Sequence, residues 1–295
     1  MEDLDTGTPT KRPHTSFSQI ETYRTCSMKY YFRYIERRPG RPNLNLARGT
    51  AGHTAVEADH RYKIGRGTNL RTDDLLDKFS DAYDAETDVL EPSDLEPGDD
   101  IGRTKDMTVE TLRVYSKTTA PKMRPIHVEL EFNLDIPPTE DYEYPIKLVN
   151  GRWDVLEATG IYDNKFPKTR RPKTVEHADQ SWQLTLYDTV LADQFNLVAP
   201  QLGFIDFLPP SQREPAKVVI TRRSPAELEP AQRAHRRARL LYVLRTTQRA
   251  IDQGIYLPAD DPRVCGYCDY RSQCQYSLAK DDYTALQIRQ KESVA

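Results

Sequence analysis

Apolar side chains recur at helical spacing through the first 120 residues and again towards the end of the chain. Trp182, Leu186 and Val190 are spaced by four, which predicts a helix over 175–195, and residues 225–253 are expected to form another. Few glycines or prolines interrupt four earlier segments that we expect to be helical: 16–36, 48–64, 72–89 and 104–119.

Between these regions the pattern changes to the alternation and short apolar runs that are typical of strands. Five segments have this character: 126–136, 144–158, 160–166, 202–208 and 217–223. The first three follow one another closely, and we expect them to be antiparallel. Helices, a strand meander, a helix and further strands together predict an α/β arrangement with a helical annex.

The composition is that of an ordinary globular protein of 295 residues, with 37% hydrophobic and 29% charged residues. No apolar run approaches the roughly 18 residues of a membrane helix, and the polar start does not resemble a secretory signal. We therefore expect a cytoplasmic protein without a membrane partner. The net charge of −3 gives no overall attraction to nucleic acid, although residues 213–249 hold ten Arg or Lys against three Glu.

Two carboxylates and a lysine lie close together in the middle of the chain. If Asp154 lies on one strand and Asp163 and Lys165 on the next, the period of two places Asp163 and Lys165 on the same face. Carboxylate oxygens suit Mg²⁺ or Mn²⁺, which lowers the pKa of water and offsets charge on a phosphate. By spacing alone, a salt-bridged hairpin is the more ordinary interpretation.

The surrounding sequence favours the chemical interpretation. GRWDVLEATGIYDNKFPKT resembles the G-x-x-D…D-x-K segment of RecB-like PD-(D/E)XK nucleases, a family that includes RecB and AddB nuclease domains and CRISPR-associated RecB-like exonucleases. RGTAGH at 48–53 resembles the family's upstream RGT…H motif. The resemblance implies a restriction-endonuclease-like core, in which a mixed central sheet is flanked by helices, with a helical N-terminal annex and a C-terminal iron–sulphur segment.

The resemblance also implies roles for single residues. Asp154, Asp163 and His53 would hold the metal ion, and Lys165 would activate the attacking water or stabilise the phosphorus centre. Taken alone, His53 is more readily explained as a helix histidine that is bonded to a backbone carbonyl.

Two further family elements have candidates here. Gln183 and Tyr187 resemble the Q-x-x-x-Y motif and would bind DNA phosphate or brace the catalytic lysine. The family also carries a glutamate on the strand before G-x-x-D. We prefer Glu129 because Phe132 supplies the aromatic residue three positions later, and Glu131 is the alternative.

All four cysteines of the chain fit one metal-binding pattern: Cys26, Cys265, Cys268 and Cys274. A cytosolic protein rarely keeps disulfides, so C-x₂-C with a third nearby cysteine favours a metal site. Thiolates hold either zinc or an iron–sulphur cluster, and the spacing does not separate the two. Residues 17–32 and 265–274 are similar to the first and last segments of the family, which implies a [4Fe–4S] cluster, with zinc as the alternative.

The function that the resemblance implies is a metal-dependent DNA exonuclease acting on single-stranded DNA or DNA ends, in recombination, repair or phage or CRISPR DNA processing. Arg233, Arg236 and Arg237 would guide the strand. A non-catalytic DNA-binding scaffold subunit and an endonuclease component of a larger complex stay open as alternatives. The chain has no G-x-x-x-x-G-K-[ST] motif, so a helicase or a recombination or CRISPR partner would have to be another chain.

The expected organisation follows the order of these motifs along the chain. We expect a flexible N-terminus (1–15), a helical region with Cys26 and the RGT…H motif (16–120), a nuclease core (121–224), a basic helix with the iron–sulphur segment (225–280) and a C-terminal tail (281–295).

Overall fold

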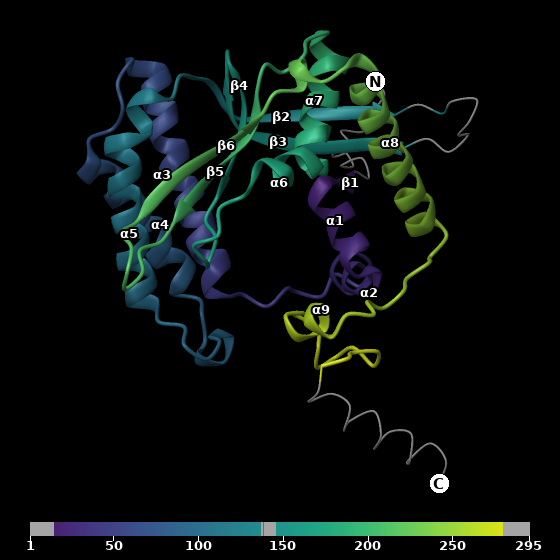
Figure 1. Cartoon of the computed structure of the whole chain (residues 1–295). Coiled ribbons are helices and arrows are strands. Elements are labelled where there is room, and N and C mark those ends of the chain that lie inside the picture. Colours follow the sequence, from purple (N-terminus) through teal and green to yellow (C-terminus); the bar gives the residue numbers. More distant parts are fainter. Residues whose placement is uncertain (1–14, 137, 139–145, 280–295) are drawn as a thin grey trace, which may run out of the picture. The chain divides into compact units, whose positions relative to one another are not determined.

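The computed structural model describes residues 15–136, 138 and 146–279 (Figure 1). The expected flexible N-terminus, except for Thr15, and the expected tail at 281–295 lie outside these residues. The chain divides into two compact units. The first unit comprises residues 1–37, 133–151 and 241–295, and the second comprises residues 38–132 and 152–240.

A mixed sheet forms the centre of the second unit. Its strands are β2 (Pro125–Ile136), β3 (Ile146–Glu157), β4 (Gly160–Lys165), β5 (Leu202–Leu208) and β6 (Lys217–Arg223). β2 pairs with β3, β3 is antiparallel to β4, β4 is parallel to β5, and β5 is antiparallel to β6. β2 and β3 continue into the first unit, where β3 also pairs with the short parallel strand β1 (Thr15–Ser16). The predicted α/β fold with a mixed, helix-flanked sheet is therefore confirmed.

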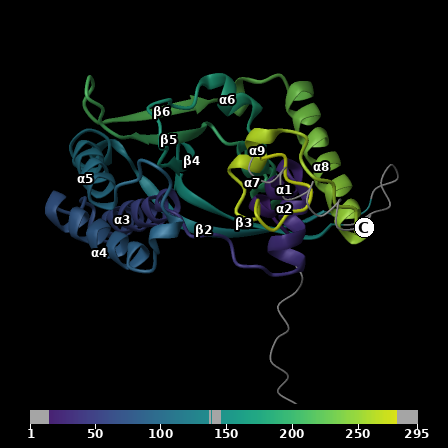
Figure 2. The same cartoon turned by 90° about the horizontal axis from the view of Figure 1, so that it is seen from below.

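Helices cover both faces of this sheet. α3 (Leu44–Arg66), α4 (Thr72–Thr87) and α5 (Ile101–Thr118) pack side by side, and α5 also packs on β5 and β6 (Figures 1 and 2). α6 (Val175–Gln180) and α7 (Trp182–Phe195) also pack against β5. All seven residues of β5 are buried, as expected for a strand that is covered on both faces. Within the described part of the chain, no helix has the length and apolar character needed to cross a membrane.

Side-chain alternation separates the two faces of the sheet. Ile205 and Phe207 of β5 belong to the core that the sheet shares with α3, α4 and α5. Phe204 and Asp206 therefore point to the opposite face, towards α6 and α7. The buried apolar residues of that shared core include Ala51, Ala55, Val56, Leu75, Phe79, Tyr83, Leu112, Tyr115, Val155 and Tyr162.

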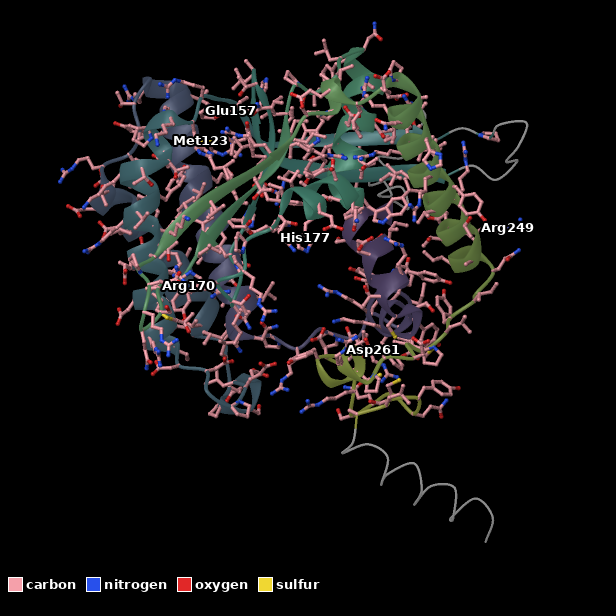
Figure 3. The ribbon with its side chains drawn as sticks, in the orientation of Figure 1. Met123, Glu157, Arg170, His177, Arg249 and Asp261 are labelled. Atoms are coloured by element: carbon pink, nitrogen blue, oxygen red, sulfur yellow. The ribbon has the colours of Figure 1, made fainter. Side chains whose placement is uncertain are left out.

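The helix predicted over 175–195 is interrupted at Ser181. This residue is extended, and its hydroxyl accepts a hydrogen bond from the backbone N–H of Leu184 at 3.2 Å, so that it ends α6 and caps α7. At the other end of α6, the ring of His177 (Figure 3) accepts from the backbone N–H of Thr174 at 3.0 Å. The helix expected from residue 225 begins later, as α8 (Pro230–Asp252), because residues 225–227 form a short 3₁₀ turn.

The first unit contains the N-terminal helices and the cysteine-rich segment. The helix predicted over 16–36 is broken at Cys26, whose extended backbone (φ −161°, ψ 109°) separates α1 (Phe17–Thr25) from α2 (Ser27–Tyr30). A single π-helical turn, Tyr31–Ile35, follows, and α9 (Pro262–Gly266) lies further along the chain. The Ser27 hydroxyl donates to the backbone carbonyl of Leu257 at 2.8 Å, which holds α2 against the segment that precedes α9.

Candidate active site

Asp154 and Asp163 come from neighbouring antiparallel strands. Val155 of β3 pairs with Tyr162 of β4, so the adjacent Asp154 and Asp163 face each other across the two strands. Asp154 Oδ2 also accepts a hydrogen bond from the backbone N–H of Asn164 at 2.8 Å, which fixes this carboxylate beside β4. Strand alternation places Lys165 on the same face as Asp163, and the two side chains form an ion pair of 2.6 Å.

Gln183 and Tyr187 of α7 brace this ion pair. Gln183 Nε2 donates to Asp163 Oδ1 at 2.7 Å and to the Tyr187 hydroxyl at 2.9 Å, while Gln183 Oε1 lies 3.5 Å from Lys165 Nζ. The Tyr187 hydroxyl in turn donates to the backbone carbonyl of Arg152 at 3.2 Å. The two residues lie one helical turn apart and share a face, so the helix presents both to the end of β4.

His53, Glu129 and Asp154 form a group of three potential metal ligands, whose ligand atoms all lie within 4.8 Å of one another. His53 Nδ1 lies 3.3 Å from Asp154 Oδ2. Asp163 lies next to this group, but its carboxylate contacts Lys165 and Gln183 instead. Its role as a metal ligand therefore stays a prediction.

Glu129 reaches the group because its backbone leaves the extended conformation. Its φ is +52°, a left-handed value that few residues other than glycine adopt and that costs about 1–3 kcal/mol. The Glu129 side chain is only 8% exposed and forms an ion pair with Arg152. Glu131, the alternative candidate, is exposed to solvent. A left-handed glutamate inside a strand has no signature in the sequence.

α3 brings His53 into place by docking on Phe166, the residue after Lys165. A Cβ atom on Gly52 would lie 2.5 Å from the Phe166 ring, so only glycine allows this close approach. Arg48 donates to the backbone carbonyl of Phe166 at 2.6 Å, and the rings of His53 and Phe166 lie 5.6 Å apart. The sequence motif RGTAGH drew attention to the histidine alone, whereas Arg48 and Gly52 provide the contacts that position it.

The carboxylates of the site are buried close together, and their pKa values reflect this. Burial, followed by the negative charge of Asp163, raises the pKa of Asp154 to about 8. Burial also raises the pKa of Glu129 and lowers that of His53, which favours the neutral imidazole that a metal requires. Burial acts to lower the pKa of Lys165, but Asp163 and other nearby carboxylates outweigh it and raise this pKa. Lys165 is therefore a fixed cation.

The model of the PD-(D/E)XK nuclease superfamily matches residues 14–275. The chain belongs to this superfamily. Membership implies a nuclease, and the enzymes of this superfamily generally depend on divalent metal ions such as Mg²⁺ or Mn²⁺. No curated protein gives a significant sequence match. A solved structure titled "Crystal structure of SSO0001" is similar at 13% identity and a TM-score of 0.38, covering 88% of this chain and 98% of that chain.

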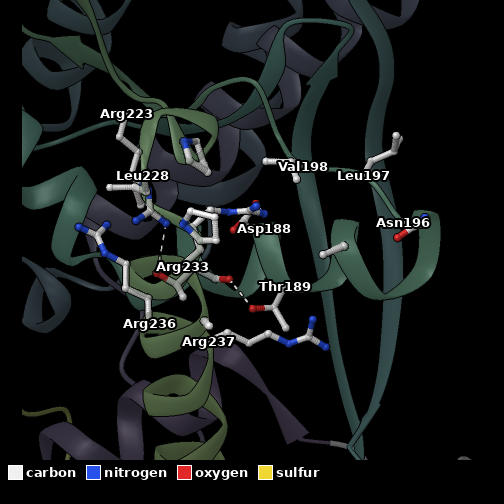
Figure 4. Close-up of a pocket in the computed structure, with 15 residues that line it drawn as sticks. Asp188, Thr189, Asn196, Leu197, Val198, Arg223, Leu228, Arg233, Arg236 and Arg237 are labelled. Atoms are coloured by element: carbon white, nitrogen blue, oxygen red, sulfur yellow. Dashed lines mark hydrogen bonds and ion pairs between the residues drawn. The ribbon is translucent and has the colours of Figure 1, made fainter.

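The three arginines predicted to guide DNA in this nuclease are engaged with acidic residues of α6 and α7. The ion pairs are Arg233–Asp188 at 3.5 Å, Arg236–Asp179 at 3.2 Å and Arg237–Asp193 at 3.3 Å. The three arginines line a cavity of about 330 Å³, where Arg236 and Arg237 extend in different directions (Figure 4). The charges of these three arginines are therefore offset locally, and their contact with DNA stays a prediction.

The four cysteines of the nuclease lie in the first unit, and none of them forms a disulfide with another described residue. They line one small cavity together with Lys29, Phe32 and Arg271. Lys29 also forms an ion pair of 3.2 Å with Asp269, which holds α2 against the cysteine-rich segment. The structure thus brings Cys26 to the three cysteines that follow more than 230 residues later.

Proposed function

We propose that this nuclease is a RecB-like, metal-dependent DNA exonuclease that hydrolyses phosphodiester bonds in single-stranded DNA or at DNA ends. The observation that carries the proposal is the convergence of His53, Glu129 and Asp154 beside the Lys165–Asp163 ion pair. The preference for an exonuclease rests on the similarity of the RGT…H motif and the cysteine pattern to RecB-like exonucleases. Recombination, repair or phage or CRISPR DNA processing would provide such substrates, with a partner chain for unwinding.

The residues of the site fit a hard divalent cation. Two carboxylates and a neutral imidazole are suitable ligands for Mn²⁺, and the carboxylates suit Mg²⁺. His53, Glu129 and Asp154 would hold the ion, with Asp163 as a further ligand. When bound, such an ion supplies Lewis acidity towards a phosphate oxygen and lowers the pKa of water.

The chain's own residues supply the remaining electrostatics. Lys165 is held at 2.6 Å by Asp163 and is contacted by Gln183, so its ammonium group is fixed before the substrate arrives. A preorganised cation of this kind stabilises the negative charge that develops on the phosphate. Because its pKa is raised, Lys165 would act as a cation rather than as a general base.

For the cysteines we propose a [4Fe–4S] cluster with a structural role. All four cysteines line one cavity, which supports a single shared site. The similarity of the cysteine pattern to RecB-like nucleases favours a cluster, with zinc as the alternative.

The activity is tested with end-labelled single-stranded DNA, end-labelled duplex and a closed circle, each in Mn²⁺, Mg²⁺ or EDTA. We expect metal-dependent release of nucleotides from labelled ends and an intact circle. Cutting of the circle would identify an endonuclease, and no cutting of any substrate at protein excess would favour a scaffold subunit.

The assigned centre is tested by Lys165→Ala, which should reduce the cleavage rate by about 10²–10³-fold and leave DNA binding in EDTA largely intact. Lys168→Ala is the matched control, because Lys168 is exposed and pairs with Glu96 and Asp99. Wild-type turnover in Lys165→Ala would refute the assignment.

A further inference from the structure

Trp182, the residue before Gln183, lines a groove between α6, α7 and the first part of α8. The groove has a volume of about 810 Å³, and all its lining residues belong to the second unit. The guanidinium carbon of Arg239 lies 5.3 Å from the centre of the Trp182 ring, within the range of a cation–π contact. The lining residues are Glu176, Asp179, Gln180, Trp182, Thr185, His235, Arg236 and Arg239.

We infer that this groove binds an unpaired base of the DNA strand, stacked on the Trp182–Arg239 pair. The inference rests on the proposed function, because it takes DNA as the substrate. Aromatic side chains accept any base as a stacking partner, and arginine adds a cation–π contribution and a charge for the backbone. A base inside a duplex is already stacked on its neighbours, so the groove would favour single-stranded DNA.

Arg239 differs from the three arginines that were predicted to guide DNA. Arg233, Arg236 and Arg237 each form an ion pair with an aspartate. Arg239 is exposed, and within the described residues no carboxylate lies within ion-pair distance of its guanidinium. Its charge is thus available to a phosphate while its guanidinium lies within cation–π distance of the tryptophan.

The charges around the groove indicate that stacking, not charge, is the main attraction. Arg236 and Arg239 are balanced by Glu176 and Asp179, and Arg236 already binds Asp179 at 3.2 Å. The contribution of Trp182 should therefore depend little on salt, whereas that of Arg239 should decline as salt increases.

The position of the groove relates it to the reaction centre. Trp182 and Gln183 are consecutive residues at the start of α7, with Cα atoms about 3.8 Å apart. Gln183 contacts both Asp163 and Lys165, so the groove begins one residue away from the reaction centre along α7. Consecutive helix residues do not share a face, so Trp182 and Gln183 point to different sides of α7.

The test uses the intrinsic fluorescence of the full-length protein, titrated in EDTA so that the DNA is not cut. The chain has two tryptophans, and Trp153 is buried at 1% exposure, so the quenching that is lost in Trp182→Phe reports on Trp182. We expect saturable quenching with a single-stranded oligonucleotide and little with a duplex or with an abasic strand of the same length. Single-stranded DNA that binds by anisotropy without quenching would overturn the inference.

Three variants separate stacking from charge. Trp182→Ala should weaken binding of the single strand by about 5- to 150-fold, and Trp182→Phe should restore most of it. Arg239→Gln should lower the slope of log K against log salt by about 0.7, as expected for one lost phosphate contact. Unchanged affinity in Trp182→Ala would contradict the inference. Quenching by DNA together with no metal-dependent cleavage by the wild type would instead refute the proposed function alone.

Discussion

Metal binding at His53, Glu129 and Asp154 should release a proton at neutral pH. Burial and the neighbouring Asp163 raise the pKa of Asp154 to about 8, so this carboxyl is mostly protonated at pH 6. A metal ion binds the carboxylate form only, and the proton must leave before the ligand can bind. The affinity should therefore increase with pH up to about 8 and level off above it.

The size of the effect follows from the fraction of Asp154 that is deprotonated. With a pKa of about 8, this fraction is about one half at pH 8 and about one per cent at pH 6. The dissociation constant for Mn²⁺ should thus be about fiftyfold weaker at pH 6 than at pH 8, or about 2.3 kcal/mol. His53 has a lowered pKa and stays mainly neutral in this range, so it adds little to the slope.

Isothermal titration of Mn²⁺ at several pH values, in two buffers with different heats of ionisation, measures both the affinity and the number of protons released. Asp154→Asn should abolish the proton release and weaken binding. Glu131→Gln is the matched control, because this exposed glutamate lies on the same strand as Glu129 and should leave both quantities unchanged. An affinity that stays flat between pH 6 and pH 8 would refute the role given to Asp154.

Four further predictions concern the surroundings of the site and the cysteines. Arg152→Ala removes the cation that competes for Glu129, so calorimetry should show tighter Mn²⁺ binding; unchanged or weaker binding would contradict this. Glu129→Gly relieves the left-handed backbone and should raise the free energy of unfolding by about 1 kcal/mol while lowering metal affinity, as measured by denaturant unfolding and calorimetry. Gly52→Ala should destabilise by about 1–3 kcal/mol because of the Phe166 ring, whereas Gly49→Ala, with no atom within 4 Å of the new Cβ, should not. Cys265→Ala should remove the brown absorbance and the iron of anaerobically purified protein and lower its melting temperature; an unchanged spectrum would exclude the cluster.

Much of the core of the fold could be predicted because local patterns determine it. Alternating residues identified the strands, and the period of two placed Asp163 and Lys165 on one face before any contact was known. The spacing of Gln183 and Tyr187 likewise gave a shared helical face. These features depend only on the geometry of a single strand or helix, so a short window of sequence contains the information.

The remaining features depend on contacts between distant segments. The aspartates that pair with Arg233, Arg236 and Arg237 lie 44 or more residues earlier in the chain, and no local rule connects them. The same holds for Gly52. A glycine is needed at this position only because the ring of Phe166 lies against α3 in the folded protein. The sequence alone did not distinguish Arg239 from Arg233, Arg236 and Arg237. The fold places an aspartate beside each of those three arginines, and no described carboxylate lies at ion-pair distance from Arg239.

The distribution of cations in the site explains why Asp154 is the residue to test. The chain supplies Arg152 to Glu129 and Lys165 to Asp163, so two of the three carboxylates have a direct cationic partner. Among the described residues, Asp154 is contacted by the backbone N–H of Asn164 and the ring of His53, with no Lys or Arg at ion-pair distance, while burial and the charge of Asp163 raise its pKa to about 8. The deficit of positive charge is thus at Asp154, which lies close to the other two proposed ligands and to the Lys165–Asp163 pair. A divalent cation would remove this deficit, which is why proton release from Asp154, more than the affinity itself, distinguishes a metal centre from a salt-bridged strand pair.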